Sequence, residues 1–290
     1  MKIWAENQAY VLAHNARFDA GLETFDLEMN HFADLNSEEF AEKYLIKIPE
    51  DYTKTTKCTG AAPSLGKVAD GVDWNAKGAV TRIKNQGQCG SCWAFSTTGS
   101  LEGAHYLKKD SLVSFSEQQL VDCSKSYGNH GCGGGLMNFS FFYVKDEGIT
   151  TEEKYPYRGV GGACHYNKET DMAWTISDCH EVKVNSEEAL RAAISHTPVS
   201  VAIEANHLSF QLYKSGVYSG NCGTKLDHGV LATGFGVDNT STSNGKTYYT
   251  IKNSWGPGWG EKGYMKMKRE EGNTGKGQCG IQMAASYPIA

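Results

Sequence analysis

Nine cysteines, spread from position 58 to position 279, constrain this 290-residue chain more than any other feature of its sequence. Most of them stand beside Gly, Ser or Asn in segments that are typical of turns. This usage is typical of a disulfide-bonded domain folded in an oxidising compartment, because cytosolic proteins keep their thiols reduced. We therefore expect several bridges, although spacing alone does not choose among the many possible pairings.

Charge and hydropathy argue against two classes of partner. The 28 Lys and Arg residues nearly balance the 33 Asp and Glu residues, so the net charge of −5 predicts no basic surface for nucleic acid. No apolar run is long enough for a membrane-spanning helix, and the start of the chain lacks the apolar core of a secretory signal. Because the cysteine usage indicates the secretory pathway, we interpret the missing signal as truncation.

Two helices are predicted at the beginning of the chain, followed by a linker. Spacings of three and four place five residues on one helical face: Trp4, Asn7, Val11, Asn15 and Phe18. A second helix is indicated where Asn36 can cap the first turn and Glu39 stands at its third helical position. From position 49 to 67 the sequence loses its periodicity and becomes rich in Thr, Lys, Ser, Gly and Pro, which is typical of a linker.

Helical signals continue to about residue 165, and strand signals follow. Ser116 can cap a helix with Gln119 at its third position, and an apolar stretch from 136 to 144 is stopped by Gly148. Beyond about residue 198, alternating or buried runs separated by turns predict strands at 199–203, 230–237, 247–252 and 264–267. The sequence therefore predicts an α+β fold with a helical half followed by an antiparallel β half.

One cysteine is placed for chemistry rather than for a bridge. Gln86 to Phe95 pass from a Gly-rich turn into a predicted helix that runs to about Lys109, which puts Cys92 at the helix N-terminus. The unpaired amides and the dipole of that terminus favour a thiolate, the reactive form of cysteine. A structural zinc site is the competing interpretation, but the second C-x-x-C that a zinc ribbon needs is absent.

The segment Cys89-Gly-Ser-Cys92-Trp93 resembles the signature of the papain and cathepsin family of cysteine proteases. That family also has a downstream His and Asn, and this chain has both. His228 lies in Leu226-Asp-His-Gly-Val230, and Asn253 opens Asn-Ser-Trp-Gly-Pro-Gly-Trp-Gly260. The resemblance implies a two-lobed papain-like fold, with a helical lobe that carries a central catalytic helix and a lobe like an antiparallel β-barrel.

The resemblance also implies a role for each site residue. Cys92 is the nucleophile, His228 the general base that forms an ion pair with it, and Asn253 the residue that orients the imidazole. Gln86 would stabilise the oxyanion together with the Cys92 backbone amide, and Trp255 would shield the His–Asn hydrogen bond. No metal or other cofactor is expected.

Six apolar or small residues are implied to line the pocket for the substrate side chain two positions before the scissile bond: Leu136, Met137, Ala202, Leu226, Gly229 and Ala284. Gly134, Gly135, Asp227 and Trp255 complete the implied substrate-binding set. None of the six pocket residues could neutralise a buried charge, so we expect a preference for hydrophobic side chains.

By the same resemblance, three bridges are expected: Cys89–Cys132, Cys123–Cys164 and Cys222–Cys279. Cys58 and Cys179 have no counterpart in this scheme, and we expect them to be buried, inert thiols.

Residues 1–67 resemble the inhibitory pro-segment of cathepsin L-like enzymes, and residues 68–290 the peptidase domain. Asn7, Val11 and Asn15 match part of the pro-segment's helix motif, and Asn30, Phe32 and Asp34 match its second motif, in which Glu28 replaces the usual Gly. The expected partners are protein and peptide substrates, the chain's own pro-segment as inhibitor, and cystatin-like inhibitors. We expect a monomer located in a lysosome or vacuole, or secreted.

Two other classes of function compete with the protease. One is a non-catalytic inhibitor protein, against which the intact catalytic residues argue; the other is a thiol–disulfide oxidoreductase that would use Cys89 and Cys92.

Asn138 and Asn239 begin sequences for N-glycosylation, and the polar surroundings of Asn239 make it the better acceptor.

Overall fold

The computed structural model describes residues 1–48, 58–60, 70–240 and 245–290 of the chain, so most of the predicted linker lies outside the described residues. The helices are α1 (Lys2–Asp19), α2 (Ser37–Tyr44), α3 (Cys92–Lys109), α4 (Glu117–Cys123), α5 (Met137–Glu147), α6 (Lys168–Asp171), α7 (Glu187–His196) and α8 (Leu208–Gln211). The strands are β1 (Phe25–Leu27), β2 (Val72–Asp73), β3 (Asp178–Glu181), β4 (Val199–Ile203), β5 (Tyr213–Tyr218), β6 (His228–Asp238), β7 (Lys246–Lys252), β8 (Tyr264–Lys268) and β9 (Ala285–Ile289). The predicted α+β class is confirmed.

Local sequence signals determine several helix ends. Asn36 caps α2 in a full capping box, because its side chain accepts from the Glu39 amide while the Glu39 carboxylate accepts from the Asn36 amide. Ser116 Oγ accepts from Gln119 N at 3.0 Å at the start of α4. Gly148 follows α5 with φ of +80°, a conformation that costs other residues energy.

The strands form a nine-stranded sheet in the order β1-β5-β8-β7-β6-β4-β9-β3, with β2 paired to β6. Most neighbours are antiparallel, as expected, but β5 and β8 are parallel. The predicted pro-segment contributes the outermost strand at one end, since Phe25 pairs with Gly216 of β5. A Cβ at Gly216 would lie 2.5 Å from Thr24 O, so this close approach needs glycine. Strand β3 forms the opposite edge.

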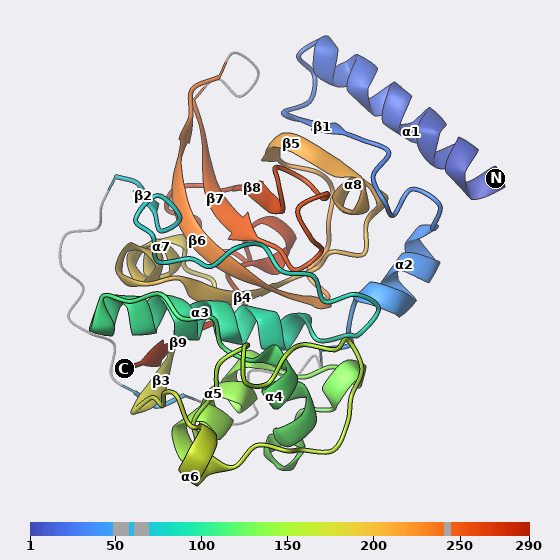
Figure 1. The fold of residues 1–290 in the computed structure, drawn as a ribbon. Coiled ribbons are helices and arrows are strands. Elements are labelled where there is room, and N and C mark those ends of the chain that lie inside the picture. Colours follow the sequence, from blue (N-terminus) through green and yellow to red (C-terminus); the bar gives the residue numbers. More distant parts are fainter. Residues whose placement is uncertain (49–57, 61–69, 241–244) are drawn as a thin grey trace.

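Helix α3 lies between two hydrophobic cores (Figure 1). One core fills the sheet side and includes pro-segment residues such as Phe32 and Phe40. The other lies among α3, α4 and α5 and includes Trp93 and Phe141. The start of α3 therefore lies at the boundary between the two lobes. In the described part of the chain, no helix combines the length and the apolar character needed to cross a bilayer.

Candidate active site

Cys92 is the first residue of α3 and is fully buried at the lobe boundary. Its Sγ accepts a hydrogen bond from the Gly229 amide at 3.4 Å, which ties it to the first residues of β6. All nine cysteines are described, and Cys92 is the one that remains a free thiol. The fold therefore brings the thiol next to the strand that begins with His228, far away in the sequence.

The hydrogen bonds of Asn253 determine which nitrogen of His228 carries a proton. His228 Nε2 lies 2.8 Å from Asn253 Oδ1, and the same oxygen accepts from Ser254 N at 2.8 Å. An atom that accepts from a backbone amide is the oxygen, so Nε2 must be the donor. His228 Nδ1 has no hydrogen-bond partner among the described residues. Its lone pair is therefore available to take the Cys92 proton.

Trp255 covers the imidazole. Its ring stacks on His228 with centroids 4.5 Å apart and an interplanar angle of 22°, and its side chain is buried. Two pro-segment rings, Phe32 and Phe40, meet Trp255 edge-on at 5.4 and 5.1 Å. The His228–Asn253 hydrogen bond is thus kept from water, which strengthens it.

The Gln86 side chain is held in one orientation by Ser254. Ser254 Oγ donates to Gln86 Oε1 at 2.6 Å, which leaves Gln86 Nε2 as a donor. That nitrogen donates at 3.1 Å to Cys89 O and at 3.1 Å to the carbonyl of Tyr44 in the pro-segment. A pro-segment carbonyl therefore occupies the donor expected to bind an oxyanion.

Sequence reasoning missed two residues that support this donor. Ser254 follows Asn253 in the same motif, so its position was a usable signal. Tyr157 OH donates to Gln86 O at 2.7 Å and accepts from Ser91 Oγ at 2.6 Å. Nothing in the sequence places Tyr157 beside Gln86, because the two are joined only by the tertiary fold.

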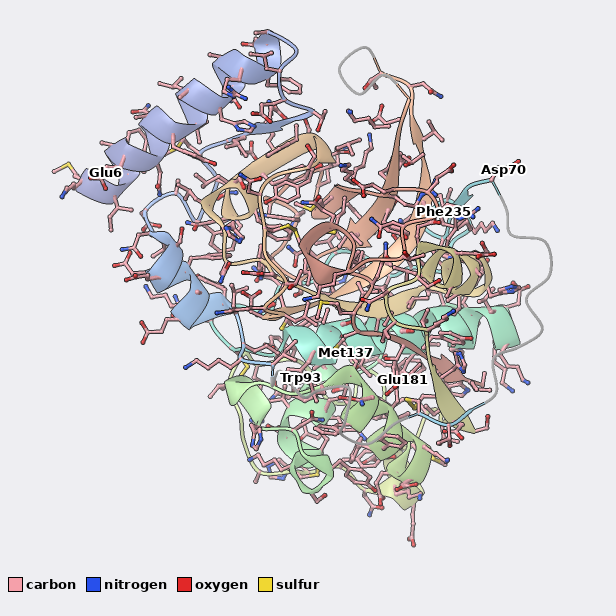
Figure 2. The ribbon with its side chains drawn as sticks, turned by 180° about the vertical axis from the view of Figure 1, so that it is seen from behind. Glu6, Asp70, Trp93, Met137, Glu181 and Phe235 are labelled. Atoms are coloured by element: carbon pink, nitrogen blue, oxygen red, sulfur yellow. A yellow bond between two sulfur atoms is a disulfide. The ribbon has the colours of Figure 1, made fainter. Side chains whose placement is uncertain are left out.

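Five of the six residues expected to line the pocket lie in or against one buried apolar cluster, which also includes a side chain of the predicted pro-segment. Leu136, Met137, Ala202 and Ala284 share one buried cluster with Ile46 and Trp93, and Leu226 packs against it. Figure 2 shows Trp93 and Met137 close together, and Met137 Sδ is also near Gly229. The backbone N of Ile46 donates to Asp227 O at 2.9 Å.

Gly134 and Gly135 lie at the edge of this cluster. A Cβ at Gly134 would be 3.4 Å from Ile46 Cβ, whereas one at Gly135 would be 2.7 Å from the Trp93 ring. Segment 44–48 thus occupies the cleft that the sequence assigns to the substrate.

Comparisons with known proteins agree with this geometry. The papain family cysteine protease model matches residues 68–289, and the cathepsin propeptide inhibitor domain model matches residues 1–40. This chain belongs to the papain family of cysteine proteases. Cathepsin L of Sarcophaga peregrina is 46% identical over 298 residues, which cover 99% of this chain and 85% of that protein.

Other relatives include plant proteins and solved proenzymes. The oryzain beta chain of Oryza sativa subsp. japonica is 46% identical over 287 residues, and this chain spans 60% of that protein's length. The proform of the ragweed pollen cysteine protease Amb a 11 has a TM-score of 0.89 at 39% identity, covering 99% of this chain and 87% of that one. Digestive procathepsin L 3 of Tenebrio molitor has a TM-score of 0.85 at 40% identity, covering 99% and 90%. The two-lobed papain-like fold is therefore shown.

The disulfides of this papain-family chain include one that the sequence did not predict. The structure contains Cys89–Cys132, Cys123–Cys164 and Cys222–Cys279, the pairing that the resemblance implied. It also joins Cys58 to Cys179. The expectation of two inert thiols was wrong, because the fold brings two positions 121 residues apart into contact.

Burial opposes both charges of the expected Cys–His ion pair in this covered site. It raises the pKa of the Cys92 thiol to about 12, although the Gly229 amide acts in the opposite direction. It also lowers the pKa of His228 to about 4, against the effect of its hydrogen bond to Asn253. The neutral thiol and imidazole are favoured while the pro-segment excludes water, because desolvation penalises each charge.

The disulfides rule out a redox role for the Cys89 and Cys92 pair in this structure. Over the described ranges, no three His, Cys, Asp or Glu side chains are grouped to hold a metal ion. Cys89 is bridged to Cys132 and is not a redox partner of Cys92, which argues against the oxidoreductase alternative.

Proposed function

We propose that this chain is the inhibited proenzyme of a cysteine endopeptidase that hydrolyses peptide bonds in proteins. The observation that carries the proposal is the convergence of Cys92, His228, Asn253 and Gln86, which come from three distant parts of the sequence, at the boundary of the two lobes. An inhibitor protein has no need of a free thiol at a helix N-terminus with a correctly oriented imidazole beside it. The four disulfides favour a secreted or lysosomal enzyme.

The first half of the reaction forms a thioester. His228 Nδ1 takes the thiol proton as Cys92 Sγ attacks the substrate carbonyl carbon. The negative charge that develops on the carbonyl oxygen is stabilised by the Gln86 side-chain amide and the Cys92 backbone amide. A donor of this kind contributes about 3 kcal/mol to the transition state. His228 then returns its proton to the leaving nitrogen as the C–N bond breaks.

The second half regenerates the enzyme. His228 Nδ1 takes a proton from water, and the resulting hydroxide attacks the thioester carbon with the same two oxyanion donors. The C–S bond breaks, the sulfur recovers the proton, and the carboxylic acid leaves. Asn253 keeps the imidazole in the tautomer that both halves require.

The pro-segment inhibits by covering three parts of this site. Tyr44 O takes the Gln86 donor, Ile46 is buried in the apolar cluster that includes the expected pocket residues, and Phe32 and Phe40 pack on Trp255. Activation therefore requires removal of residues 1 to about 67, with the mature enzyme starting near Val68. We expect the mature enzyme to be a monomer that cystatin-like inhibitors can bind.

Ile46 also supports the proposed preference for a hydrophobic side chain two residues before the scissile bond. It is 6% exposed and belongs to the same buried apolar cluster as Leu136, Met137, Ala202 and Ala284, none of which carries a charge. A Leu or Phe side chain in its place would gain roughly 1.5 to 3 kcal/mol from burial, whereas an unpaired Arg would cost several kcal/mol.

The test is covalent labelling and peptide hydrolysis by the chain after its pro-segment has been removed. We expect an epoxide inhibitor of the papain type to label one cysteine, Cys92, with loss of all hydrolysis. Cys92→Ala should abolish hydrolysis while the fold is retained, because this thiol forms no bridge.

Asn253→Ala serves as the graded control. It should lower kcat and leave measurable activity, because Asn253 orients the ring and forms no bond to substrate. Retention of most activity in Cys92→Ala would disprove the protease assignment.

A further inference from the structure

The fourth disulfide joins two parts of the chain that activation would separate. Cys58 lies in the linker between the pro-segment and the peptidase domain, and Cys179 lies on β3 of the peptidase domain. Cys58 is on the pro-segment side of the expected mature start near Val68. A cut between Gly60 and Val68 would therefore break the main chain and leave the bridge intact.

Backbone contacts around the bridge make residues 58–60 an added strand-like segment on the free edge of β3 (Figure 1). Thr59 forms an antiparallel bridge with His180, and Gly60 N donates to Cys179 O at 3.0 Å. His180 Nδ1 lies 2.6 Å from Gly60 O and, since that oxygen is an acceptor, must donate to it. Both sulfur-bearing residues are buried, with exposed fractions of 8% for Cys58 and 1% for Cys179.

Gly60 fits this edge because it has no side chain. A Cβ at this position would lie 2.3 Å from Ile289 Cδ1 and 2.8 Å from Cys179 O. The docking thus combines a covalent bond, backbone pairing and a close approach that only glycine permits. Three independent features at one place indicate a built attachment site for the linker.

We propose that the Cys58–Cys179 disulfide keeps the cleaved pro-segment attached to the peptidase domain, so that release of the active site requires a thiol reductant as well as proteolysis. This inference rests on the proposed removal of the pro-segment. The cleaved segment stays in the same molecule as its docking site, at an effective concentration on the order of millimolar. Ile46 and Tyr44 therefore return to the cleft after each opening, and the cleaved but bridged form remains inhibited.

Release is a thiol–disulfide exchange with a dithiol, or with two monothiols in sequence. A reductant thiolate attacks one sulfur of the bridge and forms a mixed disulfide, while the other sulfur leaves as a thiolate and takes up a proton. A second reductant thiol breaks the mixed disulfide. In total the bridge gains two electrons and two protons to give the thiols of Cys58 and Cys179, and the reductant becomes a disulfide.

The first arm of the test makes the cut independently of the chain's own activity. A recognition sequence for an unrelated serine endoprotease is inserted after Ser64 in the Cys92→Ala chain. After cutting and denaturation without reductant, we expect one species whose mass exceeds that of the uncut chain by one water, because hydrolysis of one peptide bond adds one. Dithiothreitol should divide it into two. The matched Cys58→Ser/Cys179→Ser chain should give two species at once, and separation of the bridged chain without reductant would overturn the proposal.

The second arm measures inhibition in the same insertion chain with Cys92 restored. Before reduction, the cut chain should react with the epoxide at Cys92 at least tenfold more slowly than after reduction. The comparison within one chain remains valid even if the serine variant folds poorly. Equal rates before and after reduction would overturn the tether as an inhibitory device. Fast labelling after reduction without any peptide hydrolysis would instead refute the proposed protease function and leave the tether standing.

The third arm uses the unmodified chain after self-processing in acid without reductant. A mature domain that still carries the pro-segment under denaturing, non-reducing conditions supports the proposal. A freed pro-segment would mean that the natural cut lies before Cys58, and would overturn it.

Discussion

Replacing Ile46 by Ala should uncover the active site of the proenzyme without touching any catalytic residue. Ile46 is 6% exposed and packs in the apolar cluster with Leu136, Met137, Ala202 and Ala284. Truncating a buried Ile to Ala costs roughly 2 to 4 kcal/mol, part of it from the cavity that remains. This cost falls on the docked state alone, because the undocked side chain is in water.

The expected magnitude follows from the opening equilibrium. A change of 1.4 kcal/mol is about tenfold in an equilibrium constant, so the open fraction should rise roughly 30- to 700-fold. An epoxide reaches Cys92 only when segment 44–48 has left the cleft, so the labelling rate of the uncut proenzyme reports this fraction. The measurement is the labelling rate at neutral pH, followed by intact mass.

Leu22→Ala is the matched control, because it also shortens an aliphatic pro-segment side chain, but one that is 65% exposed. It should leave the labelling rate within about twofold of the unmodified chain, since exposed substitutions have small effects. A similarly small change for Ile46→Ala would refute the reasoning, because the pocket would then not be what holds the segment in place.

Three further predictions concern specificity, pH and positioning. The mature enzyme should cut a substrate with Phe or Leu two positions before the scissile bond at least about tenfold faster, as kcat/KM, than the same substrate with Arg there. Ala284→Glu should reduce this difference in kcat/KM. Equal kcat/KM values for the Phe and Arg substrates in the unmodified enzyme would contradict the pocket assignment. The pro-segment has seven basic and eleven acidic side chains over residues 1–67, so processing should accelerate as pH falls toward about 4, where carboxylates in general begin to lose their charge. Separately, Asp26 accepts a hydrogen bond from Lys214 Nζ at 2.8 Å across the interface with the peptidase domain. Asp26→Asn should therefore accelerate processing at pH 6. Burial raises the pKa of Glu28, so the docked state disfavours the charged form of this carboxylate, and Glu28→Gln should slow processing at neutral pH. The same effect from both variants would contradict the model. Tyr157→Phe removes the hydroxyl that contacts Gln86 O and Ser91 Oγ and keeps the ring edge-on to Phe95. This variant should lower kcat about three- to tenfold with KM unchanged, and a change in KM alone would contradict a positioning role for Tyr157.

Local signals in the sequence were sufficient for the elements that they directly encode. The cap at Asn36, the cap at Ser116 and the stop at Gly148 each act within a few residues, so the helices they bound appear where predicted. Strands β4, β6, β7 and β8 follow from residue type and turn chemistry in the same way. The class of fold was therefore readable, as was the presence of a Cys at the start of a helix.

Contacts between distant segments depended on the tertiary structure. The pairing of Cys58 with Cys179 follows from docking of the linker on the edge of β3, and no local pattern marks that edge as its partner. The orientation of Gln86 likewise depends on Ser254 and Tyr157, which come from other parts of the chain.

The charge states of the active site were also decided by the tertiary structure. The position of Cys92 at the start of α3 favours a thiolate, and the sequence determines that much. Burial in the folded chain raises the pKa of Cys92 and lowers that of His228, because both charges lose their contact with water. The sequence, through its resemblance to family motifs, indicated which groups would meet at the proposed active site. Only the tertiary packing decided that burial favours the uncharged forms of Cys92 and His228 in this form of the protein.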